Sequence, residues 1–190
     1  MKSEQTNFRT RTVRIAGLCA CALALVIPGQ ALADGGVGTG GDGGDRETSG
    51  AKAKLKANGK AIAPASAPRR VKDAIDAANR IDKYRYEYGG GHRARGYDCS
   101  GAVSYVLGPK GARILSSPMT SGGFAGYGRK GKGNWITWYG DSGHVFVVIA
   151  GLRFDTSMPD DGDSGPGWSK DVSQGFANVS KKAARHKGSL

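Results

Sequence analysis

The chain has 190 residues, of which 32 are glycine, and its 28 lysines and arginines against 16 acidic residues give a formal net charge of +12 at pH 7. This length allows one domain and excludes a pair of catalytic domains. Hydrophobic residues make up only 38% of the chain, which is low for a fully folded protein, so we expect part of it to be unfolded.

The first 33 residues have the pattern of a secretory signal peptide. Basic residues precede an apolar run from Ile15 to Ile27, and Ala31-Leu32-Ala33 fits a small-x-small cleavage site. The run is shorter than the roughly 20 residues that span a bilayer. We expect cleavage, no stable membrane insertion afterwards, and a secreted or periplasmic protein of the cell envelope. An uncleaved anchor is the alternative.

Removal of this leader changes both the charge and the cysteine content. The leader carries four basic residues and one acid, so the net charge falls from +12 to +9. It also carries Cys19 and Cys21, which leaves Cys99 as the lone cysteine of an exported protein. Such a thiol has no internal disulfide partner and is a candidate for chemistry.

Residues 34–68 are predicted to be a disordered linker rich in glycine, alanine and lysine. The segment has no aromatic residue and almost no large aliphatic one, so it cannot bury enough surface to offset the entropy of ordering. Its lysines serve either solubility or attraction to anionic wall polymers or phospholipid surfaces.

Residues 69–190 are predicted to form one α+β domain in which helices come first and strands follow. A helix is expected where apolar residues recur on one face, at Val71, Ala74, Ile75, Ala78 and Ile81. A second helix is expected to begin near Cys99, with Asp98 as its cap and Gly108-Pro109 as its end.

Three strands are predicted in the second half of the domain, after a glycine-rich stretch over residues 110–134 that is expected to be mostly loop. They cover residues 135–139, 145–149 and 152–156, and the last alternates like a half-buried strand. Ala150-Gly151 is the expected turn between the last two. Residues 160–167 are expected to be an acidic, glycine-rich loop.

Cys99 is the candidate nucleophile because it lies in the first turn of the predicted second helix. Unpaired backbone N–H groups and the helix dipole favour the thiolate there and can also hold an oxyanion. Ser100 and Gly101 are small, which would leave room for a substrate carbonyl. The alternative is a structural cysteine that fills space in the core.

A nucleophilic cysteine needs a base, and His144 opens the most apolar strand, where its imidazole can meet a helix end. His92 and His186 lie in a glycine-rich loop and a basic tail. If Ala150-Gly151 is a two-residue turn, Asp155 falls on the same sheet face as His144 and can orient it by accepting the Nδ1 proton. His186 is the rival partner, since the tail could fold back.

Other chemistries find little support in the sequence. One cysteine and three histidines without close spacing make no recognisable zinc site. Gly89-Gly90-Gly91 lacks the lysine and hydroxyl residue that end a phosphate loop. Nucleic-acid binding would rest on charge alone, and export argues against it. We therefore expect neither a cofactor nor a nucleic-acid partner.

Three motifs in this order resemble the NlpC-type superfamily, the papain-like cysteine peptidases of bacterial cell walls. They are Tyr86-Glu87-Tyr88-Gly89-Gly90, Asp98-Cys99-Ser100-Gly101 and Ser142-Gly143-His144-Val145. The likeness covers roughly residues 71–178. It implies a papain-like α+β fold, with the cysteine helix packed on an antiparallel sheet.

The same resemblance implies roles for particular residues. Cys99 takes the place of the nucleophile and His144 that of the base, while Asp155 stands where the family usually has His, Asn or Gln. By position, Tyr86, Asp98 and Ser100 would help to hold the free amine of a peptidoglycan stem peptide.

The resemblance thus implies a peptidase that cleaves stem peptides between D-Glu and the diamino acid, without metal or cofactor. With the signal peptide, we expect this peptidase to be exported, and we expect it to be a monomer. An amidase or acyl transferase on the same fold would use identical residues. The rival class is a non-catalytic cationic protein that binds anionic wall or envelope polymers.

Overall fold

The computed structural model describes residues 51–91, 96–157 and 165–190. The predicted signal peptide, the linker as far as residue 50, His92 and most of the acidic loop lie outside the described residues. Within the described part, no helix is long and apolar enough to cross a membrane.

The centre of the domain is a six-stranded sheet in the order β3-β8-β4-β5-β6-β7, and every neighbouring pair is antiparallel. Its strands are β3 (Arg129–Lys130), β4 (Ile136–Gly140), β5 (Val145–Ile149), β6 (Leu152–Asp155), β7 (Gly167–Ser169) and β8 (Ala184–His186). The helices are α1 (Arg69–Ile81), α2 (Cys99–Leu107) and α3 (Ser121–Gly126), with two 3-10 helices, η1 (Ser173–Ala177) and η2 (Lys181–Ala183). The predicted α+β class is confirmed.

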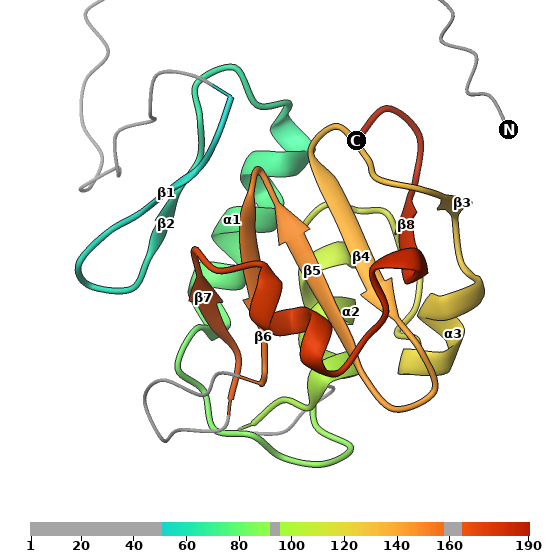
Figure 1. Ribbon diagram of the computed structural model, residues 1–190. Helices are drawn as coiled ribbons and strands as arrows, with labels where there is room; N and C mark the ends of the chain where they lie inside the picture. The colour runs from blue at the N-terminus through green and yellow to red at the C-terminus, as the bar shows by residue number, and fades with distance from the viewer. Residues whose placement is uncertain (1–50, 92–95, 158–164) are drawn as a thin grey trace, which may run out of the picture. The chain divides into compact units, whose positions relative to one another are not determined.

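The sheet lies between two covering layers. Figure 1 shows α1 and α2 behind it and the chain through η1 and η2 in front of it. We call the face toward α1 and α2 the helical face, and the face toward residues 173–184 the outer face. The core between helices and sheet is apolar, and its largest fully buried side chains include Trp138, Phe124 and Phe154.

Both predicted helices form where their patterns place them. All five apolar residues of the predicted stripe in α1 are buried, and Pro68 stands at the N-cap position. In α2 the Asp98 side chain accepts the N–H of Gly101, and Gly108 is the C-cap. The burial of one apolar face, rather than intrinsic propensity, stabilises short helices of this kind.

Residues 51–68 are part of the folded domain, so the prediction of disorder up to residue 68 is wrong for them. They form a small hairpin of β1 (Lys54–Leu55) and β2 (Ala61–Ile62). The Asn79 side chain on α1 accepts the N–H of Ala61 at 2.9 Å and donates to its carbonyl at 2.8 Å. It also accepts from the indole N–H of Trp168 at 3.0 Å. Ala53, Ala61 and Ala67 are also buried in the core, so small apolar side chains and this polar anchor together hold the segment.

The two-residue turn between β5 and β6 is confirmed. Ala150 and Gly151 both have positive φ, 47° and 87°, as a tight hairpin turn requires. Ile149 pairs with Leu152 and Val147 with Phe154. This register, continued outward, pairs position 146 with 155 and position 144 with 157.

Residues 110–134 are mostly loop, as predicted, and contain two short elements, α3 and β3. Thr120 caps α3 by accepting the N–H of Gly123, and Phe124 anchors the helix in the core. One other expectation needs correction. The strand β6 is not half-buried, because all four of its residues are buried. The C-terminal segment covers its outer face, and the predicted tail forms η1, η2 and β8.

Candidate active site

Cys99 is the first residue of α2 and is partly exposed. The Asp98 carboxylate holds the loop and helix around it. Its Oδ1 accepts the N–H of Gly101 at 2.6 Å and the hydroxyl of Ser100 at 3.0 Å, and its Oδ2 accepts the N–H of Gly89 at 2.9 Å. Asp98 therefore ties the glycine loop to the helix start that presents the thiol.

Gly101 has a different role from the one expected. A Cβ at this position would lie 2.1 Å from the carbonyl oxygen of Gly90, and one at Gly91 would lie 2.6 Å from the Cα of Gly101. The missing side chains thus let the glycine loop pack directly on the first turn of α2. The expectation that Gly101 leaves room for a substrate is corrected, because the loop backbone fills that space.

His144 stands immediately before β5, at the end of a turn that Asp141 organises. The Asp141 Oδ1 accepts the N–H groups of Gly143 at 2.8 Å and His144 at 3.0 Å. The His144 side chain is only 13% exposed. The ring is therefore fixed near the rim of the core, as its position at the start of an apolar strand predicted.

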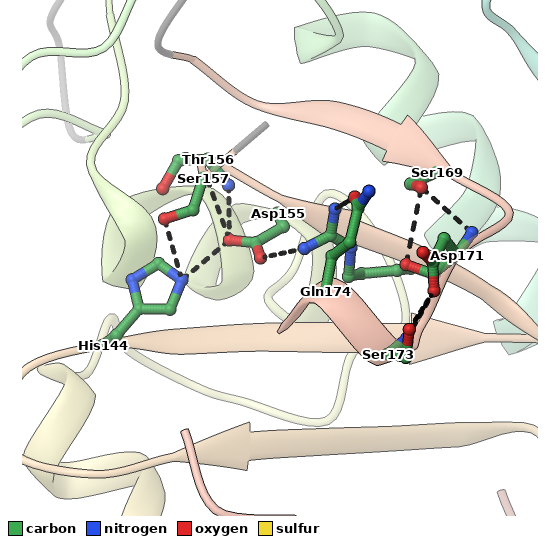
Figure 2. Close-up of polar contacts among 9 residues, drawn as sticks. His144, Asp155, Thr156, Ser157, Ser169, Asp171, Ser173 and Gln174 are labelled. Carbon is green, nitrogen blue, oxygen red and sulfur yellow. Dashed lines mark hydrogen bonds and ion pairs between the residues drawn. The ribbon is translucent and has the colours of Figure 1, made fainter. Parts of the chain in front are cut away.

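Asp155 meets the His144 ring, as the hairpin register predicted, but at the other nitrogen. Its Oδ1 lies 2.8 Å from Nε2, not at the expected Nδ1, and Figure 2 shows this contact. The same oxygen accepts the N–H of Thr156 at 2.7 Å and of Ser157 at 3.1 Å. The Ser157 hydroxyl also lies 3.4 Å from Nε2. Because Asp155 takes Nε2, Nδ1 is the nitrogen left for the thiol.

The electrostatics place a proton on this imidazole at neutral pH. Burial by itself lowers the pKa of His144, but hydrogen bonds and charge interactions with Asp155 and Cys99 outweigh it and raise the pKa from 6.5 to about 9. The ring is thus an imidazolium that faces both groups. An imidazolium beside a cysteine is the arrangement that stabilises a thiolate nucleophile.

The three residues proposed for substrate binding lie around Cys99. Tyr86 is exposed, and burial together with the nearby Cys99 and Asp98 raises the pKa of its phenol. Its backbone bridges Tyr97, two residues before Cys99. The Ser100 hydroxyl donates to Asp98, and Asp98 also accepts two backbone N–H groups, so both side chains hold the loop and helix around the thiol.

His186 belongs to another part of the sheet. It lies in β8, pairs with Arg129, and its Nδ1 lies 3.2 Å from the carbonyl oxygen of Gly188. The C-terminal tail does fold back, as the hypothesis that His186 orients His144 required. However, it does not bring His186 to the His144 ring. Asp155 is the carboxylate that contacts the His144 ring.

Sequence reasoning missed Arg153, which is fully buried and donates from Nη1 to the Asp155 Oδ2 at 3.1 Å. An arginine and an aspartate two positions apart on a strand share a face, which is the signal that could have paired them. No group of three or more metal-ligating side chains occurs among the described residues.

Neither a protein-family profile nor a curated protein matches this chain. Among solved structures, the chain is similar to a hypothetical invasion protein of Mycobacterium tuberculosis, with a TM-score of 0.42 and 22% identity. The match covers 62% of this chain and 64% of that protein, so this chain spans somewhat less than two thirds of its length.

Proposed function

We propose that the protein is an exported cysteine peptidase with a papain-like fold, and that it hydrolyses peptidoglycan stem peptides between D-Glu and the diamino acid. One observation carries the hydrolase part: Cys99 begins a helix beside His144, whose ring is held by the buried Asp155 at 2.8 Å. This order of nucleophile, base and orienting group is the arrangement of a thiol hydrolase. The substrate class rests on the sequence resemblance described above.

The reaction begins when the Cys99 thiolate attacks the carbonyl carbon of the scissile amide and forms a C–S bond. The N–H of Gly101 is already donated to Asp98, so the helix-start donors left for the oxyanion are the N–H groups of Cys99 and Ser100. The tetrahedral intermediate collapses as the C–N bond breaks and the His144 imidazolium gives its proton to the leaving amine.

The second half of the reaction releases the thioester. Neutral His144 takes a proton from water, and the resulting hydroxide attacks the thioester carbonyl. The C–S bond breaks, the carboxylic acid leaves, and the thiolate and the imidazolium are restored. Asp155 accepts from Nε2 throughout, so it holds the tautomer in which Nδ1 exchanges the proton.

Digestion of purified peptidoglycan tests the proposal. The wild-type chain should release fragments that end in D-Glu and a new free amine on the diamino acid, identified by mass spectrometry. Cys99→Ala and His144→Gln should release none, while the matched control His186→Gln should behave like wild type because His186 lies in β8. The same fragments from Cys99→Ala would overturn the enzyme assignment.

The fragment masses and the thiol together separate the alternatives. An amidase on the same fold would release whole stem peptides instead. A non-catalytic cationic binder would leave the wall intact, would show no faster alkylation of Cys99 at neutral pH than an ordinary peptide thiol, and would be released from walls as salt rises.

A further inference from the structure

The side chain of Arg153 is an unusual occupant of the outer face of the sheet. It is 1% exposed, and the side chain of Asp155 beside it on β6 is 0% exposed. Charges are costly to bury unless each is paired and hydrogen-bonded. The buried pair of Arg153 and Asp155 lies directly behind the His144 ring, so we ask which group this pair positions.

The guanidinium connects Asp155 to the segment that covers the sheet. Its Nη1 donates to the Asp155 Oδ2 at 3.1 Å, and its Nη2 donates to the Gln174 Oε1 at 3.1 Å. Figure 2 shows Asp155 between His144 on one side and Gln174 on the other. The planar fork of an arginine fixes two acceptors at once, which a lysine cannot do.

The covering segment is fitted closely to this arrangement. A Cβ at Gly175 would lie 2.7 Å from the Phe146 ring and 3.0 Å from the Cδ of Arg153. The absence of a side chain at Gly175 therefore lets η1 lie directly on Arg153. Gln174, the preceding residue of η1, is only partly buried and reaches the guanidinium from the surface side.

We propose that Arg153 and Gln174 are positioning residues that hold the Asp155 carboxylate so that Oδ1 faces Nε2 of His144. Arg153 engages Oδ2, which leaves Oδ1 for the ring and for the N–H groups of Thr156 and Ser157. Gln174 fixes the other arm of the guanidinium. The contacts from η1 to the thiol thus run through five residues, Gln174, Arg153, Asp155, His144 and Cys99. This inference rests on the proposed function only in taking Cys99 and His144 as the reacting pair.

Two opposite effects on His144 distinguish a positioning role from a merely structural one. In the described part, the ring is faced by Asp155 from β6 and Cys99 from α2, with Asp141 at its backbone and Arg153 behind Asp155. Loss of the Arg153 charge with unchanged geometry would raise the pKa of His144, because a nearby cation would be gone. Loss of the Asp155 alignment would lower it.

The test is the pH dependence of Cys99 alkylation by iodoacetamide on the full chain, which needs no peptidoglycan. The wild-type rate should show an upper inflection near pH 9, where His144 loses its proton. Arg153→Met should lower this inflection by about one pH unit, a tenfold change in the protonation equilibrium. On a stem peptide, kcat should fall about tenfold with KM nearly unchanged.

Variants of Gln174 keep the test decisive if Arg153→Met does not fold. Gln174→Ala should shift the inflection in the same direction and lower the alkylation rate about two- to threefold at neutral pH. Gln174→Glu keeps the acceptor, so its inflection should stay at or above the wild-type value. Asn178→Ala, an exposed residue directly after η1 in the same segment, is the matched control.

An inflection that stays in place or rises in both Arg153→Met and Gln174→Ala would overturn the inference. Because alkylation is measured without a wall substrate, this result is independent of whether peptidoglycan is cleaved. A protein that cleaves no wall but shows the expected shifts would contradict the proposed substrate and support the positioning role.

Discussion

The two faces of the central sheet bury their residues in different ways. Val145, Val147 and Phe154 on the helical face are all fully buried and pack against α1 and α2. The outer face also buries its residues, but it places Arg153 and Asp155 among aromatic side chains under η1. One face is closed by regular helices and apolar contacts, and the other by an irregular segment and a charge pair.

Because of this difference, we expect the helical face to contribute mainly to stability and the outer face to contribute also to the reactivity of the site. Apolar contacts on the helical face are non-directional and contribute mainly through the area removed from water. The outer face carries directional contacts that run from Gln174 to His144, and these fix the position of one ring nitrogen. We therefore expect changes on the helical face to alter stability alone, and changes on the outer face to alter reactivity as well.

The largest effect is expected for Asp155→Ala, which removes the middle of the charge chain. It leaves the buried Arg153 without this partner, and breaking a buried pair typically costs about 3–5 kcal/mol of unfolding free energy. Turnover should also fall about 10–100-fold, less than the 10⁴-fold seen in a serine triad, because the helix start supports the thiolate. Denaturant unfolding and stem-peptide kinetics on folded protein measure the two effects.

His186→Ala is the control for Asp155→Ala, because it changes a titratable residue outside the site. We expect it to leave turnover unchanged. Normal activity in Asp155→Ala together with a severe loss in His186→Ala would mean that the orienting group has been assigned wrongly.

Phe154→Ala tests the helical face. The ring is fully buried, with its centroid 4.9 Å from that of Trp168, so its removal should lower the unfolding free energy by about 3–5 kcal/mol. Cys99 alkylation by the folded fraction should stay within about twofold of wild type. A reactivity loss as large as that of Asp155→Ala, in protein that is still folded, would show that the two faces are not separable.

The sequence predicts those parts of the fold that depend on local patterns of neighbouring residues. The stripe of α1 follows the helical period, Asp98 stands in the cap position next to Cys99, and Ala150-Gly151 fits a two-residue turn. That turn sets the register of β6, and the register alone places Asp155 on the His144 face. The contact between these two side chains is therefore predictable from the sequence.

The parts that escaped prediction depend on contacts between distant residues. Arg153 alternates with apolar neighbours along β6, and this pattern predicts a side chain that faces solvent. The segment that covers it, residues 173–184, is distant in the sequence, so no local pattern indicates the burial of Arg153. The hairpin before α1 has few apolar residues and is anchored by Asn79, 18 positions away from Ala61. The sequence of α3 is half glycine, and the burial of Phe124 outweighs its poor helix propensity.

A smaller effect is expected for Phe176→Ala, the matched change to Phe154→Ala on the outer face. Its ring is only partly buried and lies 5.0 Å from that of Tyr139 and 5.6 Å from that of Phe146. Loss of these aromatic contacts should lower the unfolding free energy by about 1–2 kcal/mol. Amide hydrogen exchange should speed up over residues 173–184 while the amides of β5 keep their protection.

The exchange pattern decides whether the covering segment opens by itself. Equal acceleration in β5 and in residues 173–184 would mean that both faces unfold as one unit, which would contradict the independence of the two faces. Because Gln174 belongs to the covering segment, the Cys99 alkylation rate of Phe176→Ala should fall slightly, in contrast to that of Phe154→Ala.

The smallest effect concerns the pH dependence of stability, which we assign to the outer face. The folded-state pKa of His144 is about 9, above the ordinary value of 6.5, so the folded protein holds this proton more tightly than the unfolded chain. The stabilisation is fully present below about pH 6.5 and is lost as the pH rises toward 9.

Thermal unfolding should therefore give a Tm about 3–6 °C lower at pH 9 than at pH 6.5, relative to His144→Gln. His186→Gln should keep the wild-type slope, since that ring lies in β8. An equal slope in wild type and His144→Gln would place the proton elsewhere. The apolar side chains of the helical face hold no proton of their own, so Phe154→Ala should lower the Tm at both pH values by a similar amount and leave the slope intact.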